Sequence, residues 1–305
     1  MTREAADRPG LVRRHTRHVW KHPIRHVIQN CAMRLAPLRW VSRHFHQTGA
    51  MDDPDIVVDR AVRVVEAART GATPIADARL VEIGPGHSLG VALSLLLAGA
   101  ARVEAVDTVR YAASQPDPGS FTELWRRGTE AGLIDSTDVA EPDAELARAA
   151  ARLEYQVVDG REGWQFPEES KDIVYSFSVL EHVHDLRELL EESARVLRPG
   201  GLSIHTIDLR DHYNLGPGEN WLEFLEFEDR QWDRMTSARF AWCNRMRAPE
   251  LRALFAEIFE LVQFTEEACD LPTGFDRRRV ASRFQGFGLD ELSVSSVSVV
   301  GRRRE

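Results

Sequence analysis

Short apolar runs alternate with helix-forming stretches from about residue 53 to the end of the chain. The runs at 79–84, 103–107, 154–159 and 202–208 have the length and β-branched content of strands, and the stretch 171–183 is predicted to be a further strand that runs into a loop. Helix-forming stretches lie between them, among them 91–100 and 185–197. This alternation is typical of an α/β fold with a mostly parallel sheet.

The remaining pattern predicts helical additions to this core. Residues 11–41 carry apolar residues at helical spacing, interrupted by Pro23 and Pro37, which predicts two or three short helices in an N-terminal extension over 1–50. Residues 51–305 are then one domain, with insertions at about 108–153 and 208–247 that we expect to form helical caps. The second insertion is rich in aromatic residues with arginines between them, a pattern that indicates either core packing or an acceptor-binding surface.

A glycine-rich turn joins the first strand of the sheet to the helix that follows it. The stretch Leu80–Gly90 ends an apolar run and places Gly84, Pro85 and Gly86 at the bend. Such a turn presents backbone N–H groups to a ligand at the carboxyl edge of the sheet. Glu82, two residues before the first glycine, is a costly charge at the end of a buried strand unless it meets a cationic partner.

Further acidic residues end the next strands. Asp107 lies 21 residues after Gly86, the position from which a carboxylate reaches the ribose of a nucleotide held at the first turn. Capping of the following helix is the alternative role, because Asp also favours that position. Asp159 and Gly160 end the third strand in the same way.

Composition narrows the class of protein. The net charge is −9, yet residues 1–50 hold ten Lys or Arg against two acids, which leaves about −17 for residues 51–305. An acidic domain is unsuited to tracking a phosphate backbone, so we expect no nucleic-acid partner. No apolar run reaches the ~20 residues that span a membrane. Three scattered cysteines without a CxxC pair favour a cytoplasmic protein.

Five motifs in this order resemble class I S-adenosylmethionine-dependent methyltransferases. They are Val81–Gly86, Asp107, Asp159-Gly160, the stretch from Asp172 to Leu180-Glu181-His182-Val183, and Leu197–Gly201. The resemblance implies a seven-stranded, mostly parallel sheet with helices on both faces, whose last two strands, at about 260–266 and 292–302, form an antiparallel hairpin.

The resemblance also implies S-adenosylmethionine as cofactor and S-adenosylhomocysteine as product. It places Glu82, Gly84, Pro85 and Gly86 near the methionine part, Asp107 on the ribose hydroxyls, Asp159 and Gly160 at the adenine, and the backbone of Phe177 at the amino group. Thr108 and His182 complete the expected cofactor-binding set. Carboxylates at this rim suit a cationic, hydroxyl-bearing ligand.

Other transferases and oxidoreductases fit the motifs less well. A nicotinamide enzyme prefers G-x-G-x-x-G, whereas the glycines here fall as G-x-G-x-x-x-G. Methyltransferases that act on base amines carry an Asn/Asp-Pro-Pro-aromatic tetrapeptide after strand four, where this chain has Ser176–Val179. The stretch Met235–Arg247 is similar to uncharacterised methyltransferases of polysaccharide and secondary-metabolite clusters.

Catalysis is predicted at the end of the fifth strand. Methyl transfer requires alignment of the acceptor and, where needed, removal of its proton, and histidine accepts a proton near neutral pH. His205 or His212, oriented by Asp208 or Asp211, is the expected base. Alternatively His205 is a core histidine and Asp211 a helix cap. These four residues are also metal-ligand types, so a divalent ion stays open as an alternative, but we expect no metal.

The sequence therefore predicts methyl transfer to a small-molecule acceptor, at an oxygen of a sugar or natural product. C- or N-methylation, and a non-catalytic regulatory protein that binds the cofactor, remain the alternatives. The basic N-terminal extension is expected to cap the domain or to form a homodimer contact, with a membrane-surface segment as another alternative. The acceptor itself is not encoded in any motif.

Overall fold

The computed structural model describes residue 20 and residues 22–35, 53–109, 118–134, 141–158, 163–216 and 218–305. The strands are β1 Arg79–Ile83, β2 Arg102–Asp107, β3 Leu153–Val157, β4 Lys171–Phe177, β5 Leu197–Asp208, β6 Glu260–Ala268 and β7 Val294–Arg302. The helices are α1 Pro23–Met33, α3 Pro54–Thr70, α4 Gly90–Leu97, α5 Pro118–Glu130, α6 Pro142–Ala150, α7 Leu186–Val196, α8 Asp229–Thr236, α9 Ala248–Ile258 and α10 Leu289–Ser293. Short 3₁₀ helices are η2 Leu180–His182, η3 Glu223–Glu226, η4 Arg277–Arg279 and η5 Ser282–Phe284.

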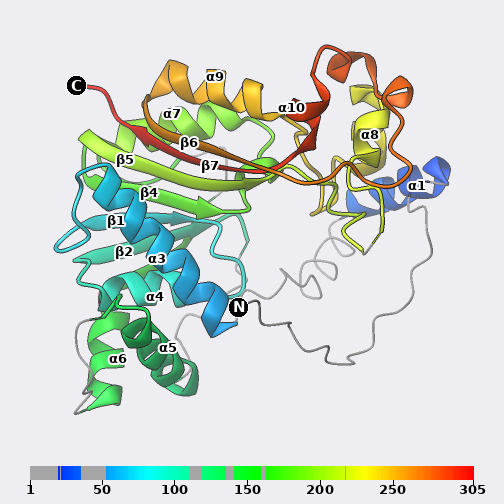
Figure 1. Ribbon diagram of the computed structural model, residues 1–305. Coiled ribbons are helices and arrows are strands. Elements are labelled where there is room, and N and C mark those ends of the chain that lie inside the picture. Colours follow the sequence, from blue (N-terminus) through cyan, green and yellow to red (C-terminus); the bar gives the residue numbers. More distant parts are fainter. Residues whose placement is uncertain are drawn as a thin grey trace, which may run out of the picture.

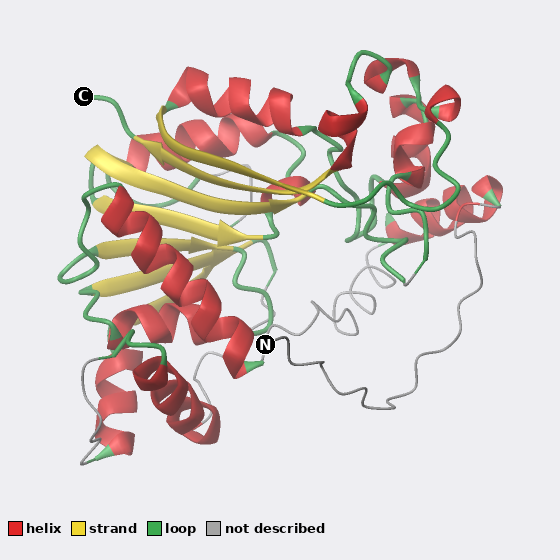
Figure 2. Cartoon of the chain, viewed as in Figure 1, coloured by secondary structure: helices red, strands yellow, loops and turns green. Residues whose placement is uncertain are grey.

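These strands form one sheet in the order β3-β2-β1-β4-β5-β7-β6. Strands β1 to β5 pair in parallel, and β7 pairs antiparallel with both β5 and β6. The antiparallel hairpin at the end of the chain confirms the predicted pairing of the last two strands. The carboxyl ends of the parallel strands point toward a second lobe that contains α1 and α8 (Figure 1; Figure 2).

Helices cover both faces of the sheet, as Figure 1 shows with α3 and α4 on one side and α7 and α9 on the other. The alternation of side chains along each strand explains the two layers. On β1, Leu80 packs into the cluster under α3 and α4, and Val81 packs into the cluster under α7 and α9. Asp53 caps α3 through its side chain, and Gly71 follows the last residue of the helix.

The two insertions differ in what they cover. Helices α5 and α6 extend the core on the α3 and α4 side, where Phe121 is almost fully buried. The second lobe has its own core, formed by residues of 221–243 together with Val280, Ala281, Phe284 and Leu292. The segment 269–293 was not predicted to belong to a cap. It nevertheless forms part of the second lobe, because its apolar side chains pack against those of 221–243.

Two details correct the sequence-based boundaries. The Arg198–Gly201 stretch, expected as a turn before strand five, lies within β5, where the register to β4 shifts. Pro23 begins helix α1 instead of interrupting a helix. Pro37, Tyr111, Asp159 and Gly160 lie outside the described residues. Within the described parts of the chain, no helix is long and apolar enough to cross a membrane.

Candidate active site

A cavity of about 1170 Å³ lies at the carboxyl ends of β1, β2, β4 and β5. It is lined by the glycine turn, the ends of these strands, helix α7 and loops of the second lobe. Its predicted site residues are Gly84, Gly86, Asp107, Thr108, Phe177, His182, Asp208 and His212. The sequence therefore placed most of its candidate residues around one space. Pro85, Glu82 and His205 are not among the lining residues.

The glycine turn has the conformation that its glycines allow. Gly84 and Gly86 have φ values of 63° and 65°, in the left-handed region that other residues rarely adopt. A Cβ atom at Gly84 would lie 2.8 Å from Cγ2 of Val179, in the loop after β4. The bare backbone at this position is therefore required both by the bend and by the close approach of the neighbouring loop.

Asp107 and Thr108 lie at the end of β2, on the next side of the cavity. Asp107 accepts a hydrogen bond from the backbone N–H of Val109 at 3.3 Å. Burial raises the pKa of Asp107 to about 6, although the N–H groups of Val109, Thr108 and Gly86 counteract it. A carboxylate in this position gains from a ligand that donates hydrogen bonds to it.

Glu82 lies behind the glycine turn, only 4% exposed. Burial raises its pKa to about 8, opposed by the hydroxyl of Tyr175 and the charge of Arg60. Its Oε2 atom has no hydrogen-bond partner in the described structure. A buried, incompletely satisfied carboxylate beside the turn fits the predicted need for a ligand with donor groups, but the described residues do not place Glu82 in contact with the cavity.

Arg60 and Phe177 also line the cavity. The guanidinium carbon of Arg60 lies 5.3 Å from the ring centroid of Phe177, a cation–π distance. Ser178, the next residue, has a φ value of 53° and donates its backbone N–H to Thr206 across the sheet. The sequence did not identify Arg60 as a site residue. Its only signal is the spacing of four residues from Ile56, which puts both on the cavity side of α3.

His212 and Asp208 face each other at the end of β5. Nε2 of His212 lies 3.6 Å from Oδ2 of Asp208 and 3.9 Å from Oε1 of Glu181. Burial lowers the pKa of His212, but the two carboxylates outweigh it, so the pKa is raised above its ordinary value. The guanidinium of Arg210 donates two hydrogen bonds to Asp208, and His212 and Arg210 together hold the pKa of that carboxyl well below its usual range against the opposing effect of burial.

Glu181 is a site residue that the sequence missed, although it lies in the Leu180–Val183 motif. It is 2% exposed, and neither carboxylate oxygen has a hydrogen-bond partner in the described structure. Burial raises its pKa to about 8. The second lobe holds this loop in place, because Asn244 donates to the backbone oxygens of Leu180 and Glu181 at 2.8 Å.

His205 is in the core and not in the cavity wall. Its Nδ1 lies 2.8 Å from the Ser176 hydroxyl and its Nε2 lies 2.6 Å from the Ser203 hydroxyl. Burial lowers its pKa to about 3. Both nitrogens are committed inside the sheet, so His205 does not reach an acceptor. This placement corrects the expectation that His205 is a candidate base and agrees with the core alternative.

Asp211 also has a structural position. It accepts hydrogen bonds from the indole N–H of Trp20 at 2.7 Å, from the backbone of Tyr213 at 2.9 Å and from the side chain of Asn214 at 3.2 Å. Its oxygens point into the second lobe, away from Asp208. Asp211 therefore anchors the N-terminal segment to the loop that carries His212.

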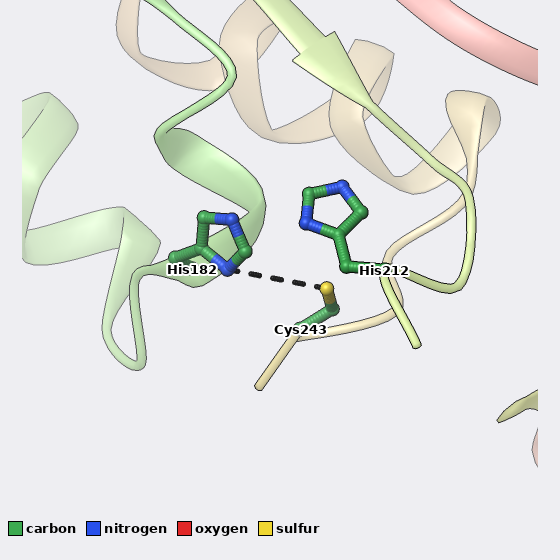
Figure 3. Close-up of side chains that lie close together, drawn as sticks. All are labelled: His182, His212 and Cys243. Atoms are coloured by element: carbon green, nitrogen blue, oxygen red, sulfur yellow. Dashed lines mark hydrogen bonds between the residues drawn. The ribbon is translucent and has the colours of Figure 1, made fainter. Parts of the chain in front are cut away.

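Three side chains of metal-ligand types lie close together: His182 and His212 line the cavity, and Cys243 is buried beside them. His182, His212 and Cys243 offer ligand atoms within 4.8 Å of one another, and Figure 3 shows the two rings beside the sulfur. However, Nδ1 of His182 donates to the carbonyl oxygen of Trp242 at 2.7 Å. Burial raises the pKa of the Cys243 thiol well above its ordinary value, which disfavours the thiolate that binds metal. We therefore retain the expectation of no metal as a prediction.

The cavity fits a sulfonium nucleoside on its own chemistry. The bare turn at Gly84 and the carboxylate of Asp107 would hold a hydroxyl-bearing cation, and the buried carboxylate of Glu82 behind the turn adds negative charge near it. Gly84, Gly86, Asp107, Thr108 and the Phe177 backbone are the residues that would bind it.

Comparison with known protein families agrees with this fold. A family model described as a methyltransferase domain matches residues 61–263, two thirds of the chain. The chain thus belongs to this methyltransferase family. It is 34% identical over 154 residues to a probable S-adenosylmethionine-dependent methyltransferase of Mycolicibacterium smegmatis, covering 49% of this chain and 48% of that protein. The chain thus spans about half the length of this curated relative.

Solved structures show a distant likeness. An S-adenosylmethionine-dependent methyltransferase from Mesorhizobium loti is 19% identical, with 78% of this chain and 96% of that chain covered and a TM-score of 0.43. A geranyl diphosphate methyltransferase in complex with SAM is 16% identical, with 81% and 85% covered and a TM-score of 0.44. The fold assignment itself depends on the strand order and the family match.

Proposed function

We propose that this protein transfers the methyl group of S-adenosylmethionine to an oxygen of a small molecule, such as a sugar or natural product. The observation that supports this proposal is that two groups of residues, one suited to binding the cofactor and one suited to accepting a proton, line the same cavity. The glycine turn and Asp107 lie on one side, and the His212–Asp208 pair lies on the other. The family match spans residues 61–263, which include both groups of residues, and is the reason for choosing methyl transfer.

The residues of the chain have separate tasks in this reaction. Bound at the turn, S-adenosylmethionine would supply an electrophilic methyl group. His212 accepts the acceptor's proton on the nitrogen that faces the cavity, and Asp208 orients the ring and stabilises the charged imidazolium. Apolar lining residues such as Ile56, Leu215 and Phe240 exclude water, which strengthens these charge interactions.

Binding and chemistry are tested separately. Isothermal titration calorimetry with S-adenosylmethionine and S-adenosylhomocysteine measures the first, and absence of binding to either refutes the proposal. Transfer of labelled methyl to a panel of sugars and phenols measures the second. We expect His212→Gln to bind the cofactor normally but to lose about 10²–10⁴-fold in kcat, the range for loss of a general base. His22→Gln, exposed on α1, is the matched control.

The alternatives have distinct outcomes in the same assays. Transfer to carbon or nitrogen acceptors, with the same dependence on Asp107, identifies a C- or N-methyltransferase. Normal cofactor binding, without transfer to any acceptor and without an effect of His212→Gln on product formation in cells, identifies a regulatory protein. The cytoplasmic location and a homodimer through the N-terminal extension remain predictions, which fractionation and light scattering check.

A further inference from the structure

Helix α1 has two different faces, and only one of them contacts other residues that the structure describes. Trp20, His26 and Asn30 are 3%, 6% and 1% exposed and lie against the second lobe. Ile24, Ile28 and Leu35 are 77%, 64% and 59% exposed, the three highest values among the large hydrophobic side chains in the described structure. With exposed Cys31, they follow the spacing i, i+4, i+7, i+11, which defines one stripe.

The inner face fixes the orientation of the helix. Asn30 donates to the backbone oxygens of Asp233 and Arg234 at 3.1 and 3.0 Å and accepts from the N–H of Ala238 at 2.7 Å. Nη1 of Arg239 donates to Nδ1 of His26 at 2.9 Å. Rotation of α1 to bury the stripe would break these hydrogen bonds. The side chains of the stripe therefore stay exposed on the described surface as long as α1 keeps this orientation. Figure 1 shows α1 at the outer end of the lobe, beside α8.

Charge selects the kind of surface that this stripe fits. Arg25 and Arg34 are exposed beside it, and residues 22–35 contain no acid. Residues 1–50 carry a net charge of +8, against about −17 for the rest of the chain. Two copies that met through α1 would bring two positive segments together. A negatively charged lipid surface is complementary both to the arginines and to the apolar stripe.

We propose that α1 docks this protein on an anionic lipid bilayer, with Ile24, Ile28 and Leu35 entering the boundary between headgroups and acyl chains. The arginines lie at the level of the phosphates, where they are attracted to the surface. The catalytic cavity remains outside the bilayer. This interaction is independent of the proposed methyl transfer, and its failure would leave that proposal unchanged.

The test is flotation of the full chain with vesicles of phosphatidylcholine, with and without phosphatidylglycerol. We expect the protein to float with the anionic vesicles and to be released by salt, because screening weakens the attraction. Ile24→Ser/Ile28→Ser should weaken partitioning by at least about tenfold, since burial of one Ile side chain is worth more than that factor. Leu289→Ser, which truncates an exposed leucine of α10, is the matched control and should float normally.

Circular dichroism and thermal unfolding establish that each variant is folded; the substituted side chains are exposed, so no change is expected. The proposal is overturned if the wild-type protein stays with the unbound fraction, or if the double variant floats as well as the wild type. It is also overturned if Ile24→Ser/Ile28→Ser converts a dimer to a monomer in light scattering without changing flotation. Arg25→Gln/Arg34→Gln should reduce flotation with anionic vesicles only.

Discussion

Trp20→Phe tests how the N-terminal segment is tied to the catalytic loop. The substitution removes the indole N–H that donates to Oδ2 of Asp211 at 2.7 Å. It keeps an aromatic ring among Tyr213, Phe227 and Trp232, whose ring centroids lie 5.0 to 5.5 Å from that of Trp20. The lost interaction is therefore mainly one hydrogen bond to a buried carboxylate.

The expected cost follows from the charge of Asp211. A hydrogen bond to a charged group contributes about 1.5–3 kcal/mol, and one between neutral groups about 0.5–1.5 kcal/mol. Burial raises the pKa of Asp211 to about 7, with Trp20 opposing that rise. Because the pKa of Asp211 is higher in the folded than in the unfolded protein, protonated Asp211 contributes to the free energy of unfolding. This contribution is complete below about pH 4 and is lost as pH rises through 7. Removing the N–H raises the folded pKa further, so the loss in Trp20→Phe grows with pH.

Urea unfolding at pH 5.5 and pH 8.5 measures this difference. We expect a decrease in the free energy of unfolding of about 1.5–3 kcal/mol at the higher pH and a smaller one at the lower pH. Trp232→Phe is the matched control: its indole N–H donates to the neutral carbonyl of Cys243 at 2.8 Å, so its cost should not depend on pH. A pH-independent loss in Trp20→Phe, or additivity with Asp211→Asn, would refute the reasoning.

Three further predictions concern the cavity. Gly84→Val should abolish cofactor binding in calorimetry because of the left-handed backbone and the clash with Val179. Gly132→Ala, at a residue that is also left-handed but has open space around it, should bind the cofactor normally. Cofactor binding by Gly84→Val would contradict the role assigned to the turn. Asp208→Asn should lower kcat and move the acidic limb of the pH–rate profile to lower pH, because loss of the carboxylate lowers the pKa of His212; an unmoved limb means that His212 is not the base. Treatment with EDTA should leave the rate unchanged, and loss of activity with recovery on zinc addition would instead identify the group in Figure 3 as a metal site.

The centre of the sheet was predictable because strands β1, β2 and β4 are buried on both faces and are bounded by clear turns. Apolar runs such as 79–84 and 103–107 had to be strands, since each is too short for a buried helix and ends in a glycine or an acid. The Arg198–Gly201 stretch was misplaced because Pro and Gly indicate a turn locally. Here the backbone instead continues into β5. A Cβ atom at Gly201 would lie only 3.0 Å from the carbonyl oxygen of Asp172, so the close approach of the two strands explains the glycine.

Site residues were predictable only where a sequence motif marks the end of a strand. Gly84, Asp107 and Asp208 end strands, and strand ends of a parallel sheet meet at one edge, so their grouping follows from the topology. The choice between His205 and His212 could not follow from spacing alone. His205 lies within β5, where alternation turns its side chain into the core, whereas His212 lies in the loop after β5, whose path toward the cavity the spacing does not predict. Glu181 and Arg60 contribute through three-dimensional contacts that no local pattern encodes.

The two loops that place Glu181, His182 and His212 at the cavity both depend on the second lobe. The η2 loop with Glu181 and His182 is held by Trp242 and Asn244, and the loop after β5 with His212 is held by Trp20 through Asp211. The cofactor side, by contrast, is built from strand ends of the sheet. Changes in the lobe should therefore alter kcat and the KM for the acceptor while leaving the affinity for the cofactor unchanged, and the N-terminal segment belongs to the catalytic unit because it completes the core of that lobe.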